Sequence, residues 1–422
     1  MEGTAAQASV GSVEPRAGTK PALHRVAAIY GGNGTGKTNL LKALEYMKSA
    51  VRNSQKIWPP DGPIPRDPFL LNAKSGNEPS FFEAELAVED KSFRYAFTLT
   101  DQEILEERLD VSTEGRRQML LRREGQNFAI GDDLAGDHQT AKRLTRRNSL
   151  FLSAAAAAKH PVLLPVYQAF AKQITCLPWN RFSLRRTTAE ACQDKSLRPL
   201  IERMLREADP AIAGLSVRQE DLLRPLFESN DPRTYALLGE LIGPLQKLLA
   251  AARGEAPGTA DIFEKRPVLS LSHTSSDGAD AALDQAHESD GVLALLELAV
   301  PVLQAIRTGG TVCVDEIGAG LHPLQALRIL HLFNTPKLAG RPVQIIFTTL
   351  DTNLLTAASL QRDQIWFTEK DNEGCTHLYP LSDFMPERNE NLRQGYLQGR
   401  YGPVPFIGWT NFIARLDSGA SR

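Results

Sequence analysis

The sequence predicts an α/β protein with a mixed sheet, an antiparallel β subdomain beside it and a helical insertion. An apolar run at 26–30 ends in glycines and precedes leucines at helical spacing, which indicates a buried strand, a loop and a helix. Residues alternate with period two from 81 to 111 around a turn at 89–91, which predicts an antiparallel hairpin. Further strand patterns, separated by helical ones as in a parallel sheet, lie at 267–273, 311–314 and 343–349.

Helical patterns fill most of the stretch between the two groups of strands. They lie at 154–158, 166–174, 199–207 and 233–252. A later helical pattern, from Leu293 to Leu303, contains Pro301, which is expected to kink or divide that helix. We therefore expect a parallel sheet whose strands are separated in the sequence by a helical insertion.

Composition excludes several classes of protein. The 422 residues carry 48 Lys and Arg against 50 Asp and Glu, a net charge of −2, which argues against general neutralisation of nucleic-acid phosphates. The four cysteines are far apart and form no C-x-x-C pair, so we expect a reducing, cytoplasmic location. The longest apolar stretch, 292–306, is shorter than a membrane span and contains two polar residues, so no membrane is expected.

The strongest motif is the glycine-rich loop that follows the first strand. It matches G-x-x-x-x-G-K-[ST], in which glycines let backbone N–H groups curl around phosphates at the start of a helix. Lys37 is expected to reach the β- and γ-phosphates of ATP, and Thr38 to place its hydroxyl on Mg²⁺. The predicted nucleotide-binding residues are Gly31, Gly32, Asn33, Gly34, Thr35, Gly36, Lys37, Thr38 and Asn39.

An acidic pair follows the apolar strand pattern at 311–314. Asp315 is expected to hold Mg²⁺, directly or through water, as carboxylates do in phosphoryl-transfer sites. Glu316 lies one residue beyond the strand end, where it is expected to polarise the attacking water as general base. Lys37 and Glu316 are therefore the predicted catalytic residues.

Several motifs together resemble the ABC-type ATPases of the AAA abortive-infection group, relatives of the OLD ATPases and of the SMC-like repair ATPases. They are the phosphate loop, the acidic pair, Gly318-Ala-Gly-Leu-His-Pro323, Glu288-Ser-Asp-Gly291, 346–355, 363–371 and 395–402. The resemblance implies a cassette ATPase head that dimerises head to tail around ATP, or forms a higher oligomer. It also implies that Ser289 and Gly291 contact the γ-phosphate bound by the other protomer. Taken alone, Ser-Asp-Gly is more often a plain helix N-cap, and the resemblance is what favours the phosphate contact.

The sequence departs from this group at two places. Members usually carry a histidine after the Thr-Thr of the switch strand, whereas this chain has Leu350, which cannot donate a hydrogen bond from its side chain. The loss of one such donor can slow a reaction by about a hundredfold. ATP binding is expected to survive this change, and hydrolysis to be slowed. The members also open with an extra strand, of which residues 1–22 show no pattern.

Three functions fit these observations. In the first, an ATP-hydrolysing dimer controls a separate effector, such as a nuclease, in bacterial defence against phage. In the second, a nucleotide-gated scaffold or sensor hydrolyses little ATP because of Leu350. In the third, a repair-type ATPase binds nucleic acid through the helical insertion, although a solvated surface explains the same basic residues, which are Arg143, Arg146, Arg147, Arg185 and Arg186.

The chain is expected to divide into five segments. These are a disordered lead-in at 1–22, a first ATPase lobe with the phosphate loop and β subdomain at 23–147, the helical insertion at 148–260, a second ATPase lobe with the signature-like and acidic segments at 261–390, and a C-terminal extension of the head at 391–422.

Overall fold

The computed structural model separates the chain into two compact units. The first unit comprises residues 1–179 and 304–422, the second residues 180–303, and each is described by itself. The structure describes residues 12–13, 23–71, 75–89, 91–113, 116–178, 185–220, 244, 266–275, 280–338, 341–357, 360–387 and 390–402.

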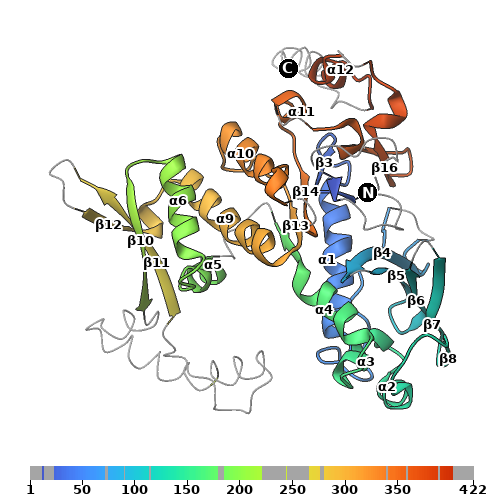
Figure 1. The fold of residues 1–422 in the computed structure, drawn as a ribbon. Coiled ribbons are helices and arrows are strands. Elements are labelled where there is room, and N and C mark those ends of the chain that lie inside the picture. The colour runs from blue at the N-terminus through green and yellow to red at the C-terminus, as the bar shows by residue number, and fades with distance from the viewer. Residues whose placement is uncertain are drawn as a thin grey trace, which may run out of the picture. The chain divides into compact units, whose positions relative to one another are not determined.

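A six-stranded sheet forms the centre of the first unit. Its strand order is β16-β15-β3-β14-β13-β9, and all neighbours are parallel except the edge pair β15 and β16 (Figure 1). The strands are β3 (Val26–Tyr30), β9 (Ile174–Leu177), β13 (Gly310–Val314), β14 (Val343–Thr348), β15 (Ile365–Lys370) and β16 (Thr376–Pro380). Every residue of β3 is fully buried, as expected for a parallel strand covered on both faces.

The helices of the first unit connect and cover these strands. The helix that follows β3 contacts the one that precedes β9. The helices are α1 (Lys37–Asn53), α2 (His138–Leu144), α3 (Phe151–Ala157), α4 (Leu163–Gln173), α10 (Pro323–Phe333), α11 (Leu354–Ala357) and α12 (Leu392–Leu397), with 3-10 turns at Pro336–Leu338, Arg362–Gln364 and Leu381–Phe384.

A five-stranded antiparallel sheet lies in the same unit. Its strands follow in chain order as β4 (Ser80–Val88), β5 (Lys91–Leu99), β6 (Ile104–Thr113), β7 (Arg116–Glu124) and β8 (Asn127–Ile130). One hydrophobic core joins its inner face to helices α1, α3 and α4, through side chains such as Phe97, Leu109 and Phe170. The predicted hairpin is confirmed, and with it the predicted fold class, a parallel sheet with a separate antiparallel one.

Two segments within 148–260, a stretch expected to be mostly helical, form strands. Ile174–Leu177 forms β9, which pairs in parallel with 311–314 of β13 and completes the central sheet. Ile212–Glu220 forms β10, which pairs antiparallel with β11. Both segments contain apolar or β-branched residues that fit a strand as well as a helix, and the available partner strand decides between the two. The predicted helix at 233–252 lies outside the described residues, apart from residue 244.

The second unit contains a three-stranded antiparallel sheet, ordered β10-β11-β12, and two helices that contact it (Figure 1). Its elements are β10 (Ile212–Glu220), β11 (Arg266–Thr274), β12 (Asp280–Asp284), α5 (Arg185–Ala191), α6 (Arg198–Ala208) and a 3-10 turn at Gln285–His287. The five-segment division of the chain stays a prediction.

Helix α9 (Asp290–Thr308) begins in the second unit and ends in the first. It is continuous with Pro301 inside, so the predicted division of this helix at the proline does not occur. Among the described residues it is the one helix apolar and long enough to cross a membrane, with a mean hydropathy of 1.5. Because 72% of that stretch is buried within the protein, its apolar surface is covered as in a core helix.

Part of the predicted lead-in forms a strand. Ser12–Val13 (β1) pairs antiparallel with Leu23–His24 (β2), directly before β3. The expectation that 1–22 has no strand is therefore wrong at these two residues, which gain backbone partners from a segment ten residues further along the chain. The rest of the predicted lead-in lies outside the described residues.

Candidate functional site

The phosphate loop joins the carboxyl end of β3 to the start of α1, as its motif predicts. Gly36 precedes the helix in the left-handed region, with φ 99°, and Gly34 has φ 79°. Glycine adopts these angles without the strain that a Cβ would add. The loop therefore turns its backbone at the helix N-terminus, where N–H groups bind anions.

Lys37 is buried and folds back over its own loop. Its Nζ donates hydrogen bonds to the carbonyl oxygens of Gly31, at 2.8 Å, and Gly32, at 3.0 Å. Burial lowers the pKa of Lys37, and the carboxylates of Glu316 and Asp315 oppose that lowering. The ammonium group is thus held by two neutral carbonyls, which a phosphate oxygen can replace.

Asp315 follows the end of β13 and faces Thr38 at the start of α1. The Thr38 hydroxyl lies 3.0 Å from Asp315 Oδ2 and 3.2 Å from Oδ1. The two residues are 277 positions apart in the sequence, and the fold brings together the pair predicted to bind Mg²⁺. A hydroxyl and a carboxylate are oxygen ligands of the kind that Mg²⁺ prefers, so the donor set fits this ion.

Thr348 connects the two members of the acidic pair. Strand β14 lies between β3 and β13, so its last residue is placed between the phosphate loop and Asp315. The Thr348 hydroxyl donates to Asp315 Oδ1 at 2.7 Å and accepts the Glu316 N–H at 2.7 Å. Thr348 is fully buried, so one hydroxyl holds both the Asp315 carboxylate and the Glu316 backbone.

Glu316 adopts a left-handed conformation, with φ 50°. A non-glycine residue in this region carries about 1 kcal/mol or more of backbone strain, which the surrounding contacts must offset. Besides the Thr348 contact, its Oε1 accepts the backbone N–H of Leu350 at 3.0 Å. The carboxylate is therefore aimed at the switch segment.

The switch position itself, Leu350, has a side chain that is 45% exposed. Asp351 accepts from the backbone and side chain of Asn353 at 2.9 and 2.8 Å, which closes a local turn. His322 caps α10, because its Nδ1 accepts the Leu324 N–H at 3.2 Å. Asp351 and His322 are thus both used in local structure, and the backbone amide of Leu350 contacts the Glu316 carboxylate.

The signature-like residues lie at the start of α9. Ser289 Oγ accepts the Val292 N–H at 3.3 Å, so this serine is the N-cap of a 19-residue helix, and Gly291 is in its first turn. These residues belong to the second compact unit, and their role across a dimer stays a prediction.

Two of the basic residues proposed to bind nucleic acid have structural partners. Arg146 donates to the carbonyl oxygens of Ser54, at 2.7 Å, and Trp58, at 3.1 Å. Arg147 pairs with Glu103 at 2.7 Å and is 64% exposed. Arg146 therefore serves as an internal tie between helix α1 and the following loop. The side chains of Arg185 and Arg186 lie outside the described residues.

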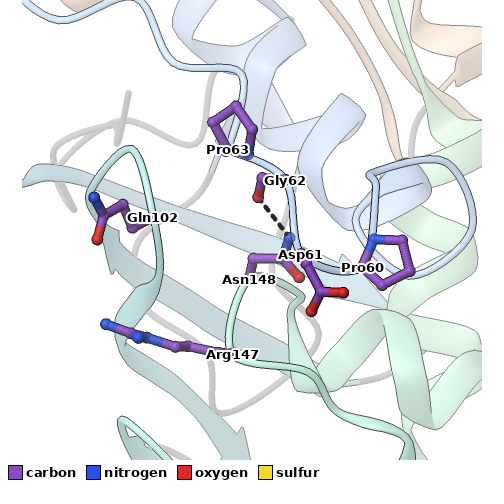
Figure 2. Close-up of a pocket in the computed structure, with 7 residues that line it drawn as sticks. All are labelled: Pro60, Asp61, Gly62, Pro63, Gln102, Arg147 and Asn148. Atoms are coloured by element: carbon purple, nitrogen blue, oxygen red, sulfur yellow. Dashed lines mark hydrogen bonds between the residues drawn. The ribbon is translucent and has the colours of Figure 1, made fainter.

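A cavity of about 440 Å³ lies elsewhere in the first unit (Figure 2). Its lining comprises residues 60–63, Gln102, Arg147 and Asn148, and includes no residue of the phosphate loop or the acidic pair. Asn148 donates to the carbonyl oxygens of Pro59, at 2.8 Å, and Gly62, at 3.0 Å, which holds the loop that forms one wall. This cavity is therefore separate from the nucleotide chemistry.

The strand order and the phosphate loop define the chain as a P-loop NTPase-type fold. A family model described as "AAA domain, putative AbiEii toxin, Type IV TA system" matches residues 26–356, well over half of the chain. The chain belongs to this AAA domain family. The match includes the phosphate loop, the acidic pair and the switch segment, and it ends before β15.

Solved structures of SMC heads are similar to this chain at low identity. One is an SMC head bound to the C-winged helix domain of ScpA, 11% identical with a TM-score of 0.40, over 87% of this chain and 96% of that one. Another is the SMC head domain from Thermotoga maritima, 12% identical with a TM-score of 0.32, over 87% and 97%. No curated protein sequence matches the chain.

Proposed function

We propose that the protein binds ATP with Mg²⁺ and hydrolyses it. The observation that carries this proposal is the contact of Thr38 with Asp315, at 3.0 Å, beside the buried Lys37. A phosphate-loop hydroxyl and a strand-end carboxylate on either side of one position are what a nucleotide-bound Mg²⁺ requires. Membership of the AAA domain family supports the same activity.

Lys37 would bind the nucleotide by exchanging its partners. Its Nζ now donates to Gly31 O and Gly32 O, and the β- and γ-phosphate oxygens would take their place. The carbonyls offer Lys37 only a dipole, whereas phosphate oxygens offer a full opposite charge as well as the hydrogen bonds, so the exchange is favourable. Thr38 and Asp315 would hold the Mg²⁺, which neutralises charge on the phosphates.

Glu316 would act as general base for the attacking water. Its carboxylate is placed by Thr348, through the backbone, and by the Leu350 N–H, through Oε1. The second of these contacts must loosen if Oε1 is to accept a proton from water. Movement of the switch backbone would thereby control when Glu316 is available, without any hydrogen bond from the side chain at position 350.

We further propose that two copies dimerise around ATP. Ser289 at the N-terminus of α9 offers a hydroxyl and helix N–H groups to an anion, as the γ-phosphate of the partner copy would require. The dimer would control a separate effector protein, such as a nuclease, in defence against phage. The family description, which names an AbiEii-type toxin, supports a role of this class.

Steady-state phosphate release tests the enzyme hypothesis. We expect the wild-type protein to release phosphate from ATP in a Mg²⁺-dependent manner, and Glu316→Gln to bind ATP but release phosphate at least about a hundredfold more slowly. Oligomeric state would be measured in parallel, with and without ATP and Mg²⁺. Wild-type turnover no higher than that of Glu316→Gln would exclude hydrolysis as the function.

The alternative is a nucleotide-gated scaffold or sensor with little turnover. The observation that favours it is Leu350, whose exposed side chain stands where a donor to the γ-phosphate is usual. In that case ATP would still drive dimerisation in the wild type, and Leu350→His would gain activity. No gain in Leu350→His, with fast turnover in the wild type, would argue for the enzyme.

A DNA-binding repair role would require binding to DNA that weakens steeply as the salt concentration rises.

A further inference from the structure

The edge hairpin β15–β16 continues beyond the end of β3 and runs alongside the phosphate loop. In the register of the sheet, Phe367 is opposite Tyr30, the last residue of β3, so Thr368 lies next to the first glycine of the loop. Thr376 pairs with Lys370 at the far end of the same hairpin. Two threonines, far from the loop in sequence, are thus placed against its outer side.

Thr376 holds the second half of the loop through a backbone carbonyl. Its hydroxyl donates to the carbonyl oxygen of Thr35 at 2.9 Å, across 341 positions of sequence. A loop that turns N–H groups toward phosphate leaves carbonyl groups such as that of Thr35 facing elsewhere, and a donor fixed to such a carbonyl holds the loop backbone in place. Thr376 supplies that donor directly before Gly36 and Lys37.

Thr368 supplies a second contact through a pair of hydroxyls. Its Oγ1 lies 2.7 Å from Thr35 Oγ1 and 3.2 Å from Tyr30 O, and Thr35 Oγ1 lies 2.9 Å from Gly32 O. Two hydroxyl protons are shared among these three contacts, so one contact at a time has no proton. The two hydroxyls can therefore donate to Gly32 O and Tyr30 O together, or to one of these carbonyls while the other hydroxyl donates to its neighbour.

This sharing is coupled to Lys37. In the present state Gly32 O has two donors, Lys37 Nζ at 3.0 Å and the Thr35 hydroxyl at 2.9 Å. When Lys37 turns to a phosphate, Gly32 O loses that donor, and the Thr35 hydroxyl can donate to it while Thr368 donates to Thr35. The buried hydroxyl of Thr368 thus holds the Thr35 side chain where its own hydroxyl reaches Gly32 O in both positions of Lys37.

Two of the four glycines of the loop, Gly31 and Gly36, face the hairpin closely. A Cβ at Gly31 would collide with Thr368 Oγ1, and one at Gly36 would collide with Thr376 Oγ1. The hairpin therefore contacts the loop backbone so closely that only glycine is accommodated at these two positions.

Aromatic packing makes the hairpin a firm support. The Phe367 ring stacks between Tyr396, at 5.5 Å, and Tyr401, at 5.8 Å between ring centroids. Burial raises the pKa of Tyr396, and a hydrogen bond from the Gly31 N–H to its hydroxyl opposes this rise. The segment 392–402 therefore fixes the hairpin and also contacts the first glycine of the loop.

We propose that Thr368 and Thr376 are positioning residues for nucleotide binding, which set the shape of the phosphate loop through Thr35. The proposal rests on the proposed function, since it concerns the same loop. Both threonines lie beyond residue 356, where the family match ends, so the support for the loop comes from the C-terminal part of this chain.

The test is equilibrium binding of ATP with Mg²⁺ to the full-length chain. Thr368→Val and Thr376→Val keep shape and remove one hydroxyl each. We expect the Kd for ATP to rise about tenfold for the buried Thr368 and about fivefold for the exposed Thr376, because each variant removes one hydrogen bond. Serine at either position is expected to restore binding. Thr113→Val, at an exposed position of β6, is the matched control.

Each outcome separates the two proposals. If the wild type does not bind ATP, the proposed function fails. If the wild type binds and both valine variants bind equally well, the positioning role is overturned while the function stands. Should Thr368→Val fold poorly, Thr376→Val, which lies on the surface, decides alone. At saturating ATP, the kcat of both valine variants is expected to stay within about twofold of the wild-type value. A general loss of structure would instead lower kcat and the affinity for ATP together.

Discussion

The first compact unit contains two clusters in which acidic and basic side chains lie close together. The two clusters differ in the groups that bind these charges. One is the pair Glu107 and Arg123 in the antiparallel sheet, and the other is the proposed nucleotide site with Lys37, Asp315 and Glu316. Glu107 and Arg123 are fully buried, whereas Lys37 and Asp315 are buried with 8% and 6% of their surface exposed. Burial therefore does not distinguish the two clusters. What distinguishes them is the set of hydrogen-bond partners around each charged group.

The charges of the first cluster are saturated by fixed donors and acceptors. Glu107 accepts from the Phe151 N–H at 2.6 Å, the Leu152 N–H at 2.9 Å and the Tyr95 hydroxyl at 2.8 Å, besides Arg123 at 3.3 Å. Arg123 in turn donates to several backbone carbonyls, those of Gly125, Ser149, Arg146 and Arg147. This cluster joins strand β6 to the start of α3 and leaves no position for a ligand.

The charges of the nucleotide site have partners that can be exchanged. Lys37 is bound by two carbonyls of a loop, and Asp315 by two hydroxyls. Neither makes a direct ion pair with the other in the described contacts. A saturated buried ion pair is thus a structural tie, while buried charges held by neutral groups are available to phosphate and Mg²⁺.

The largest expected effect is the loss of stability in Arg123→Met. This change leaves the Glu107 carboxylate buried with its cation removed, which should lower the free energy of unfolding by about 3–5 kcal/mol. Denaturant unfolding would measure it. Arg147→Met, which breaks the exposed pair with Glu103, is the matched control and should cost less than about 1 kcal/mol. Equal losses in the two variants would contradict the structural role of the buried pair.

Removing the cation of the proposed nucleotide site should weaken ATP binding and leave the stability of the fold nearly unchanged. In Lys37→Met, removing a buried ammonium held by neutral carbonyls should change the free energy of unfolding by no more than about 1 kcal/mol. The Kd for ATP should rise about a hundredfold, because two charge-assisted contacts to phosphate are lost. Calorimetric titration would show this, with Lys42→Met, an exposed lysine of the same helix, binding ATP normally. A Lys37→Met protein that is unfolded would place Lys37 with Arg123 as a structural residue.

The sequence predicts those parts of the site that have a recognisable pattern within a few consecutive residues. The strand 26–30, the glycine loop and the acidic pair at a strand end each have their own pattern, and the structure places β3 over those same residues. Thr348 belongs to the Thr-Thr of the switch motif, but no pattern gives its hydroxyl a role, and Thr368 lies in the middle of a strand, where threonine is ordinary. Their roles arise from the order β15-β3-β14-β13, which brings each of them beside the loop or the acidic pair.

The same reason explains the errors. Strand β9 and strand β10 depend on a distant partner strand, and the short apolar run at 174–177 carries no local sign of one. Arg146, in a basic run that reads as solvent-exposed, donates to carbonyls of residues about ninety positions earlier. Sequence patterns thus predict which residues form the loop, and tertiary packing decides which residues hold it.

The smallest expected effect is that of Thr348→Val, which removes one neutral hydroxyl from the acidic pair. It tests whether neutral partners position the charges of the proposed nucleotide site. In Thr348→Val the Asp315 carboxylate loses one donor and the Glu316 N–H loses its acceptor. Since each contact is worth about 1 kcal/mol, phosphate release should fall about tenfold or more, and half-maximal activity should need more Mg²⁺. ATP binding without Mg²⁺ should be unchanged, because Lys37 and the loop are intact. Thr348→Ser, which keeps the hydroxyl, should behave as the wild type. If serine and valine were equally impaired, the packing of the methyl group, and not the hydroxyl, would be what positions the acidic pair.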